Sequence, residues 1–178
     1  MKLKITLDSN SIKAAIDELN KYRNSLAAKN ELFMNRLLDE GISVAYRHVG
    51  KYTGYIEFTK DVDNMGTKCI GVLTGKNTKP YISVWRYRGD FKKVEVNALA
   101  MAEFGSGWLA NVMWNVPGVG QGTFPGQTHA TDPQGWYWVD AQNVKHHSIG
   151  ETPQYPMYSA EMDMLAQIDK IAREVFHE

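Results

Sequence analysis

A few acidic residues and histidines are the side chains that could carry chemistry. Glu103 and Asp132 could act as the paired carboxylates of a glycosidase, and Glu103 with His129 or His147 could act in a small hydrolase. His129, Asp132 and one of the adjacent His146 and His147 could bind zinc if their segment folded back on itself. Nothing in the spacing brings these groups together, so we expect no catalytic centre, cofactor or metal.

Two other patterns look reactive but have simpler explanations. Cys69 lies in an apolar, strand-like run without a basic partner, and we expect a buried, inert thiol. As the single cysteine, it forms no intramolecular disulfide and does not indicate an oxidising compartment. The glycine-rich residues 118–126 lack the Gly-Lys-Ser/Thr ending of a phosphate loop, so we expect a flexible loop there.

Aromatic residues are concentrated in residues 105–156, which hold four of the five tryptophans and five of the six prolines. We interpret this stretch as a long insertion, a hairpin arm that projects from a sheet. Three roles stay open: anchors of a protein interface, a stacking surface for carbohydrate or nucleic acid, and a small local core. A carbohydrate-binding module would use Trp136 and Trp138. The candidate interface anchors are Trp108, Trp114, Phe124, Trp136, Tyr137 and Trp138.

Two helices are predicted to frame the chain. Apolar residues recur at helical spacing from Ile12 to Val49, which predicts one long helix that ends near residues 48–50. The helix should pass through Gly41 at a cost of about 1 kcal/mol relative to alanine. A second helix should begin at Pro156, whose ring suits a first-turn position, and carry its apolar stripe to Val175.

Strands are predicted between the helices. Residues 54–59, 67–74, 80–88 and 92–104 are rich in β-branched, aromatic or alternating apolar residues, and turn residues separate the first three. We therefore expect a single α+β domain over residues 1–178. Its long N-terminal helix and its C-terminal helix would pack on a mostly antiparallel four-stranded sheet, with residues 105–156 as the arm.

Charge is unevenly distributed along the chain, although the net charge is zero. Residues 1–93 carry 17 basic against 10 acidic residues, and residues 94–178 carry 3 against 10. The two halves either pack together in one fold or meet head to tail between subunits. The zero net charge argues against a free-standing nucleic-acid binder. Neither a long apolar run nor a signal-peptide pattern is visible, so we expect no membrane association and a cytoplasmic location by default.

Several segments together resemble a known family. They are Ala102-Glu103-Phe104-Gly105-Ser106-Gly107, residues 122–129, Gly135-Trp136-Tyr137-Trp138, residues 147–150 and the helix entry at residues 156–160. In this order they are similar to tailed-phage neck proteins, which are described as tail-completion, head–tail joining or minor tail components. The insertion resembles the branch found in Gram-positive hosts and their prophages. The family usually has threonine at the position of Ser106.

The resemblance implies a structural virion protein and not an enzyme. Subunits would form a ring, six-fold by analogy, at the head–tail junction, complete the tail and join it to the capsid. Partners would be copies of the chain, neighbouring neck or connector proteins and tail-tube or tail-terminator proteins, with sequence-independent DNA contact in the lumen. The protein would pass through the host cytoplasm during assembly. The turn that launches the arm would comprise Glu103, Phe104, Gly105 and Gly107.

Overall fold

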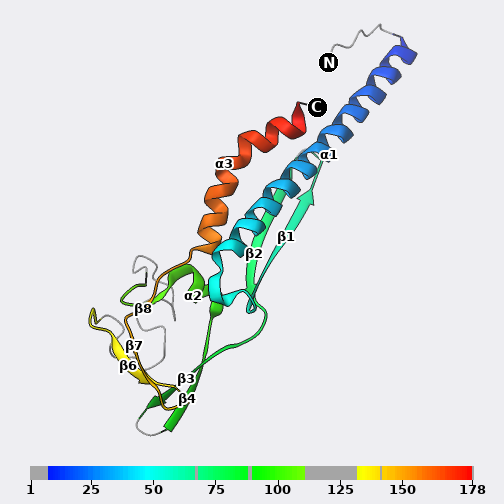
Figure 1. Ribbon diagram of the computed structural model, residues 1–178. Helices are drawn as coiled ribbons and strands as arrows, with labels where there is room; N and C mark the ends of the chain where they lie inside the picture. The colour runs from blue at the N-terminus through cyan, green and yellow to red at the C-terminus, as the bar shows by residue number, and fades with distance from the viewer. Residues whose placement is uncertain (1–7, 67, 88–89, 111–131, 141, 178) are drawn as a thin grey trace.

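The computed structural model describes residues 8–66, 68–87, 90–110, 132–140 and 142–177. The fold is α+β, with a long helix at each end of the chain and small antiparallel sheets between them (Figure 1). The helices are α1 (Ser9–His48), the 3-10 helix η1 (Gly50–Tyr52), α2 (Ala98–Phe104) and α3 (Pro156–Phe176). The strands are β1 (Ile56–Asn64), β2 (Cys69–Asn77), β3 (Tyr81–Tyr87), β4 (Asp90–Val96), β5 (Ser106–Gly107), β6 (Trp136–Val139), β7 (Lys145–Ser148) and β8 (Gly150–Glu151).

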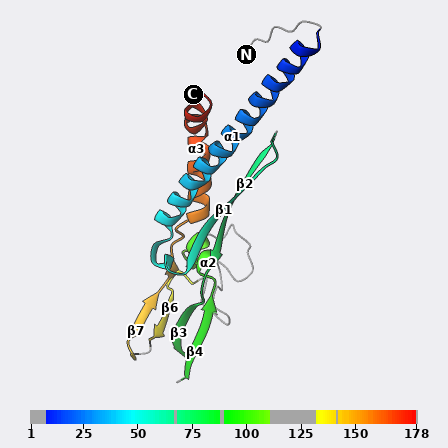
Figure 2. The same ribbon diagram turned by 90° about the vertical axis from the view of Figure 1, so that its right-hand side faces the viewer.

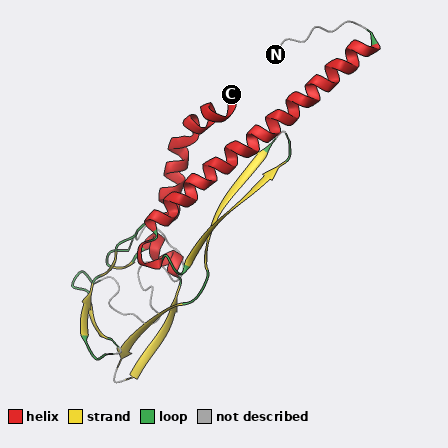
Figure 3. Cartoon of the chain, turned by 45° about the vertical axis from the view of Figure 1, so that its right-hand side comes forward, coloured by secondary structure: helices red, strands yellow, loops and turns green. Residues whose placement is uncertain are grey.

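Helix α1 confirms the prediction of one long N-terminal helix. The Asp8 carboxylate caps its start by accepting hydrogen bonds from the backbone N–H groups of Asn10 and Ser11 at 3.1 and 2.9 Å. The helix continues through Gly41 and ends at His48, where Gly50 adopts a positive φ of 55°. At 40 residues, α1 extends far beyond the elements that pack on its C-terminal half (Figures 1 and 3).

Helix α1 is the centre of the helical layer. Helix α3 lies along one side of it and the β1–β2 hairpin along the other (Figure 2). Side chains of both neighbours pack on Gly41, because a Cβ atom there would lie 2.6 Å from the Met164 Sδ of α3 and 2.9 Å from the Leu73 Cδ1 of β2. The helix-weakening glycine therefore permits three elements to meet.

The sheets are smaller than predicted. Within the described residues, hydrogen bonding groups the strands into antiparallel pairs, β1–β2, β3–β4, β5–β8 and β6–β7, and not into one four-stranded sheet. The first hairpin pairs Ile56 with Asn77 and Asn64 with Cys69. The pattern of apolar residues predicted β1, β2 and β3. It could not specify that β2 and β3 form no hydrogen-bonded pair with each other.

The predicted strand over residues 92–104 is wrong beyond Val96. Strand β4 ends there, and Asn97 caps helix α2 by accepting a hydrogen bond from the backbone N–H of Ala100 at 2.9 Å. The alternating alanines that suggested a strand are also strong helix formers, and the cap decides between the two structures. Glu103 and Phe104 therefore end a helix and not a strand.

The main core lies where the C-terminal end of α1 meets α2 and the beginning of α3. It contains buried side chains from six elements and their connections: Ala45, Val49, Tyr52, Ile56, Phe58, Val96, Ala98, Met101, Ala102 and Ala160. A second, smaller cluster of Leu37, Ile171 and Val175 joins α1 to the C-terminal half of α3. Both clusters hold the two long helices together, and neither reaches the N-terminal half of α1.

Candidate functional site

The segment from Glu103 to Gly107 fastens the beginning of α3 to the rest of the fold. The Glu103 carboxylate is 9% exposed and accepts hydrogen bonds from the backbone N–H groups of Met157 at 2.8 Å and Tyr158 at 3.0 Å. These are the donors that an N-cap side chain normally satisfies. Tyr155 occupies the N-cap position in a left-handed conformation without a side-chain cap, and Pro156 follows it with no N–H to satisfy. Glu103 thus caps α3 from another helix.

Backbone contacts complete this fastening. The Ala102 carbonyl accepts hydrogen bonds from the N–H groups of Gln154 at 2.7 Å and Tyr155 at 3.2 Å. Strand β5 then pairs with β8, and the Ser106 hydroxyl accepts the N–H of Glu151 at 3.2 Å. Gly105 has a φ of 71°, and a Cβ atom there would lie 2.2 Å from the Glu151 carbonyl oxygen, so only glycine fits. These residues form what we call the α2–α3 junction, residues 102–107 with 150–158.

A polar group ties the end of α1 to this junction. The Glu151 carboxylate accepts a hydrogen bond from the Tyr52 hydroxyl at 2.5 Å and pairs with the Lys51 ammonium at 2.5 Å. Burial, followed by the hydrogen bond to the Glu151 carboxylate, raises the pKa of Tyr52 far above its ordinary value of 10.0. The Tyr52 hydroxyl therefore stays protonated throughout the physiological pH range and keeps its hydrogen bond to the Glu151 carboxylate.

The aromatic residues of the β6–β7 hairpin contact their own chain. The Trp136 ring covers Gly107, where a Cβ atom would lie 2.7 Å from the ring. Trp138 stacks on His146 at 4.4 Å between ring centroids, and the His146 Nε2 lies 2.7 Å from the Asp140 carboxylate. Both tryptophans are thus partly buried against their own chain, and the choice among the three roles that the sequence left open stays a prediction.

The other candidate anchors differ from this pair. Tyr137 is 66% exposed and packs beside His147 and under the Lys145 ammonium, 4.2 Å from its ring centroid. Trp108 is 50% exposed. Trp114 and Phe124 lie outside the described residues, as do His129 and the glycine-rich residues 118–126.

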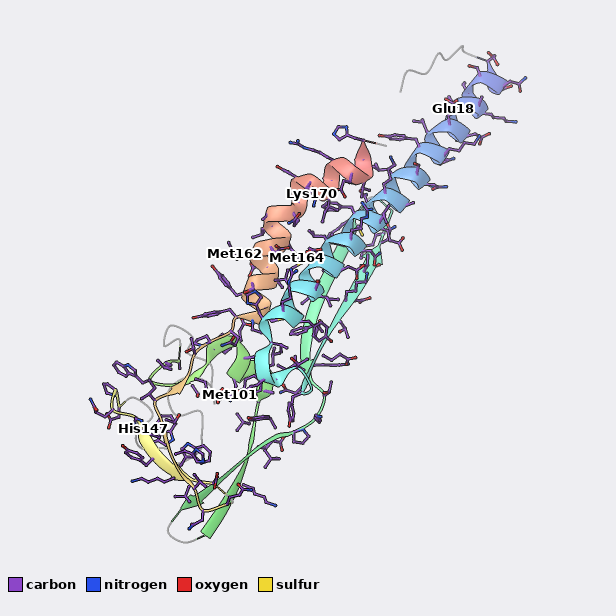
Figure 4. All side chains as sticks on the ribbon, in the orientation of Figure 1. Glu18, Met101, His147, Met162, Met164 and Lys170 are labelled. Atoms are coloured by element: carbon purple, nitrogen blue, oxygen red, sulfur yellow. The ribbon has the colours of Figure 1, made fainter. Side chains whose placement is uncertain are left out.

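The residues suggested for a hydrolase or metal site take part in structural contacts. Both Glu103 oxygens accept backbone N–H groups of α3, and the His147 Nε2 lies 2.6 Å from the Gln134 carbonyl oxygen (Figure 4 labels His147). Asp132 accepts the backbone N–H of Gln134 at 2.8 Å. Among the described residues, no group of three metal-ligating side chains converges.

Cys69 is partly exposed at the beginning of β2, which corrects the expectation that it is buried. Desolvation, with the nearby carboxylates of Glu31 and Asp63, raises the pKa of the Cys69 thiol. A raised pKa keeps the thiol protonated and weakly nucleophilic.

Two apolar helix faces are exposed to solvent. The first, which we call the α1 stripe, lies in the N-terminal half of α1 and is 38–55% exposed: Ile12, Ile16, Leu19, Tyr22 and Leu26. The second, the α3 outer stripe, is 48–57% exposed: Tyr158, Met162 and Leu165. Figure 4 shows Met162 on the side of α3 away from α1, whereas Met164 points between the two helices. Sequence periodicity identified the residues of the α1 stripe but could not tell that they are exposed, and it did not identify Tyr158 and Met162 of the α3 outer stripe.

An apolar groove of about 530 Å³ adjoins the α2–α3 junction. Leu73 of β2, Leu99 and Phe104 of α2, and Met157 and Met164 of α3 line it, and Glu103 lies at its wall. Its other polar lining residues are Asn97, Tyr158 and Glu161, and the Glu103 carboxylate is occupied by the α3 cap.

The comparisons add no relative to these observations. None of the helices in the described residues is both long and apolar enough to cross a bilayer. No family model, curated protein or solved structure gives a significant match to the chain.

Proposed function

We propose that this chain is a structural virion protein of a tailed phage or prophage. Its copies form a ring, six-fold by analogy, at the head–tail junction, which completes the tail and joins it to the capsid. The support is the resemblance of residues 102–107, 122–129, 135–138 and 156–160 to the neck-protein family, together with the surface of the fold. Neighbouring neck, connector, tail-tube or tail-terminator proteins are the further partners in this proposal.

The observation that carries the proposal is the exposed apolar stripe in the N-terminal half of α1. A monomeric soluble protein rarely leaves a continuous apolar stripe exposed along a helix, because covering it is favourable. Five large side chains of the α1 stripe are each at least 38% exposed. A subunit that is completed by its neighbours explains this surface, whereas neither a hydrolase nor a carbohydrate-binding module requires it.

The proposal also gives residues 105–156 a role. In this proposal the segment contacts neighbouring subunits, with Trp108 and Tyr137 of its described part as exposed aromatic contacts. Basic residues of the first 93 positions that face the lumen of the ring contact passing DNA through its phosphates. The mature location is then the virion.

The test is deletion of the gene from its phage or prophage, followed by negative-stain electron microscopy of the lysate. The expected result is DNA-filled heads separate from unattached tails, with joining restored by the wild-type gene. Complementation with a gene lacking residues 108–140 should fail, whereas the His129→Ala gene should restore infectivity. Intact infectious particles from the deletion would reject the proposal.

A further inference from the structure

The two exposed helix faces, the α1 stripe and the α3 outer stripe, belong to the same chain. The α1 stripe repeats at spacings of four, three, three and four residues, and the α3 outer stripe at four and three. Both follow the periodicity by which helices pack on helices. Each chain therefore carries two surfaces that are each suited to receive a helix.

The α1 stripe is continuous with an interface that already exists within the chain. Farther along α1, Phe33, Leu37 and Val44 continue the same face at helical spacing. There α3 covers the face, with the Phe33 ring 5.9 Å from the ring of Phe176 and Leu37 in the cluster with Ile171. The face thus packs against a helix in its C-terminal half and is exposed in its N-terminal half.

The lengths of the two helical segments agree, although the exposed stripe extends over 15 residues of α1 and over 8 residues of α3. The part of α1 before its contacts with α3, residues 9–30, is about 33 Å long at 1.5 Å per residue. Helix α3 has 21 residues and is about 31 Å long by the same rise. One α3 therefore spans the whole exposed part of one α1. Figure 4 shows Glu18 within this part, beyond the end of α3.

The charges of the two surfaces are complementary. Residues 9–30 carry four basic and two acidic residues, and α3 carries four acidic and two basic residues. Arg23 lies within the α1 stripe, four residues after Leu19. Asp169 lies within the α3 outer stripe, four residues after Leu165. The opposite net charges of the two helical segments, with Arg23 and Asp169 on the stripes themselves, favour this pairing over the pairing of either segment with itself.

We propose that the α1 stripe of one copy packs on the α3 outer stripe of the next copy, with Arg23 facing Asp169. This inference rests on the proposed function, for which it names the contact between ring neighbours. A two-fold dimer through α1 alone would leave the α3 outer stripe exposed and would bring two basic surfaces together. A head-to-tail contact covers both stripes, and repeated around an axis it closes a ring.

Cysteine crosslinking of the full chain tests the geometry. In a Cys69→Ser background, Leu19→Cys and Leu165→Cys are purified separately, and each replaces an exposed side chain. A disulfide-linked dimer should form on mixing the two proteins under mild oxidation, and neither protein should crosslink alone. Crosslinking of Leu19→Cys with itself would overturn the proposal in favour of an α1–α1 dimer. A mixture without crosslinks at millimolar concentration would overturn it as well.

Charge exchange tests the Arg23–Asp169 contact. Arg23→Glu should weaken self-association, measured by sedimentation velocity, by about tenfold, and Asp169→Lys should do the same. The two variants mixed should associate about as well as the wild type, because the reversed charges are again opposite. Lys21→Glu is the matched control, since its position faces away from the α1 stripe and its effect should be under twofold. Equal effects of Arg23→Glu and Lys21→Glu, or no recovery on mixing, would overturn the pairing.

These outcomes are distinct from those of the gene deletion. Mixed crosslinks from a protein whose deletion leaves infectious particles would support the interface and reject the proposed function. Separate heads and tails from the deletion, together with no crosslink between Leu19→Cys and Leu165→Cys, would support the function and reject the interface.

Discussion

Replacing Glu103 should destabilise the protein through the end of a helix that does not contain it. Its carboxylate accepts the N–H groups of Met157 and Tyr158 at 2.8 and 3.0 Å and is 9% exposed. Glu103→Ala removes both acceptors and leaves the two N–H donors without a protein partner. Glu103→Gln keeps one carbonyl oxygen and the shape of the side chain but loses the charge.

The expected magnitudes follow from these contacts. A hydrogen bond to a charged group contributes about 1.5–3 kcal/mol, and loss of an N-cap costs about 0.5–2 kcal/mol. Because the two bonds of Glu103 share one carboxylate, we expect about 2–4 kcal/mol for Glu103→Ala. For Glu103→Gln we expect about 1–2 kcal/mol, since one bond and the charge on the helix dipole are lost.

Urea unfolding followed by circular dichroism measures these changes in the free energy of unfolding. Thermal unfolding should show a decrease in Tm of about 6–12 °C for a loss of 3 kcal/mol in a protein of this size. Amide hydrogen exchange should be accelerated at Met157 and Tyr158 before it changes elsewhere in α3. Glu161→Gln is the matched control, because it neutralises an exposed carboxylate on the next turn of α3 and should change the free energy by under about 0.5 kcal/mol.

Two results would refute the reasoning. One is a Glu103→Ala protein as stable as the wild type, which would mean that water replaces the cap without loss. The other is equal destabilisation by Ala and Gln with unchanged exchange at Met157 and Tyr158, which would place the effect in the packing of α2 and not at the start of α3.

Three further predictions concern the same region and the hairpin beside it. Gly105→Ala should cost about 3 kcal/mol or more, against about 1 kcal/mol for Gly66→Ala, because both have positive φ but only Gly105 would contact backbone. Tyr52→Phe should lower the free energy of unfolding by about 1–2 kcal/mol, because it removes the hydrogen bond to Glu151. The wild-type protein should lose stability as pH rises above 10.0, because the raised pKa of Tyr52 favours the neutral phenol in the folded state. The hydrogen bond to His146 lowers the pKa of Asp140, so its contribution should be present above pH 3.8 and lost as pH falls through the lower folded pKa.

Each of these has its own measurement. Equal urea midpoints for the two glycine variants would contradict the predicted clash with the Glu151 carbonyl. A Tyr52→Phe protein that keeps the wild-type sensitivity to alkaline pH would show that another group titrates there. For Asp140, the carboxyl carbon shift followed by NMR should titrate below 3.8, and a midpoint at or above that value would exclude the His146 contact in solution.

The two long helices could be predicted from the sequence because their signals are local and repeated. The apolar spacing from Ile12 to Val49 outweighs a single Gly41, and Pro156 marks the start of α3 with its fixed φ. The strands of the first two hairpins were predicted for the same reason. Which strands pair was not predictable, since it depends on connections and packing that the alternation of side chains does not record.

Helix α2 was missed although its signals are present. Asn97 is a strong N-cap, and the residues after it have high helix propensity, but the alternation of Ala98, Ala100 and Ala102 favoured a strand. Alanine alternation is weak evidence, because alanine suits the buried face of either structure. The N-cap residue Asn97 is therefore a stronger indication of a helix than the alternation of alanines is of a strand.

The capping role of Glu103 could not be predicted from local sequence patterns, because Met157 and Tyr158 are more than fifty residues away along the chain. One signal could have found it. Helix α3 begins with Tyr155 and Pro156, neither of which supplies a capping side chain. A helix N-terminus without a local cap requires an acceptor from elsewhere, and a lone acidic residue in an apolar run is the natural candidate.

The β5–β8 pair has a consequence for how this protein tolerates change in length. Ser106 pairs with Glu151 and Gly107 with Gly150, so the two ends of the intervening segment leave the fold side by side. The entropy of closing such a segment grows only with the logarithm of its length, about 0.6 kcal/mol for each doubling. Added residues in this segment should therefore cost the helical layer little, whereas removal of the segment would also remove the packing of Trp136 on Gly107 and of β6 on β3.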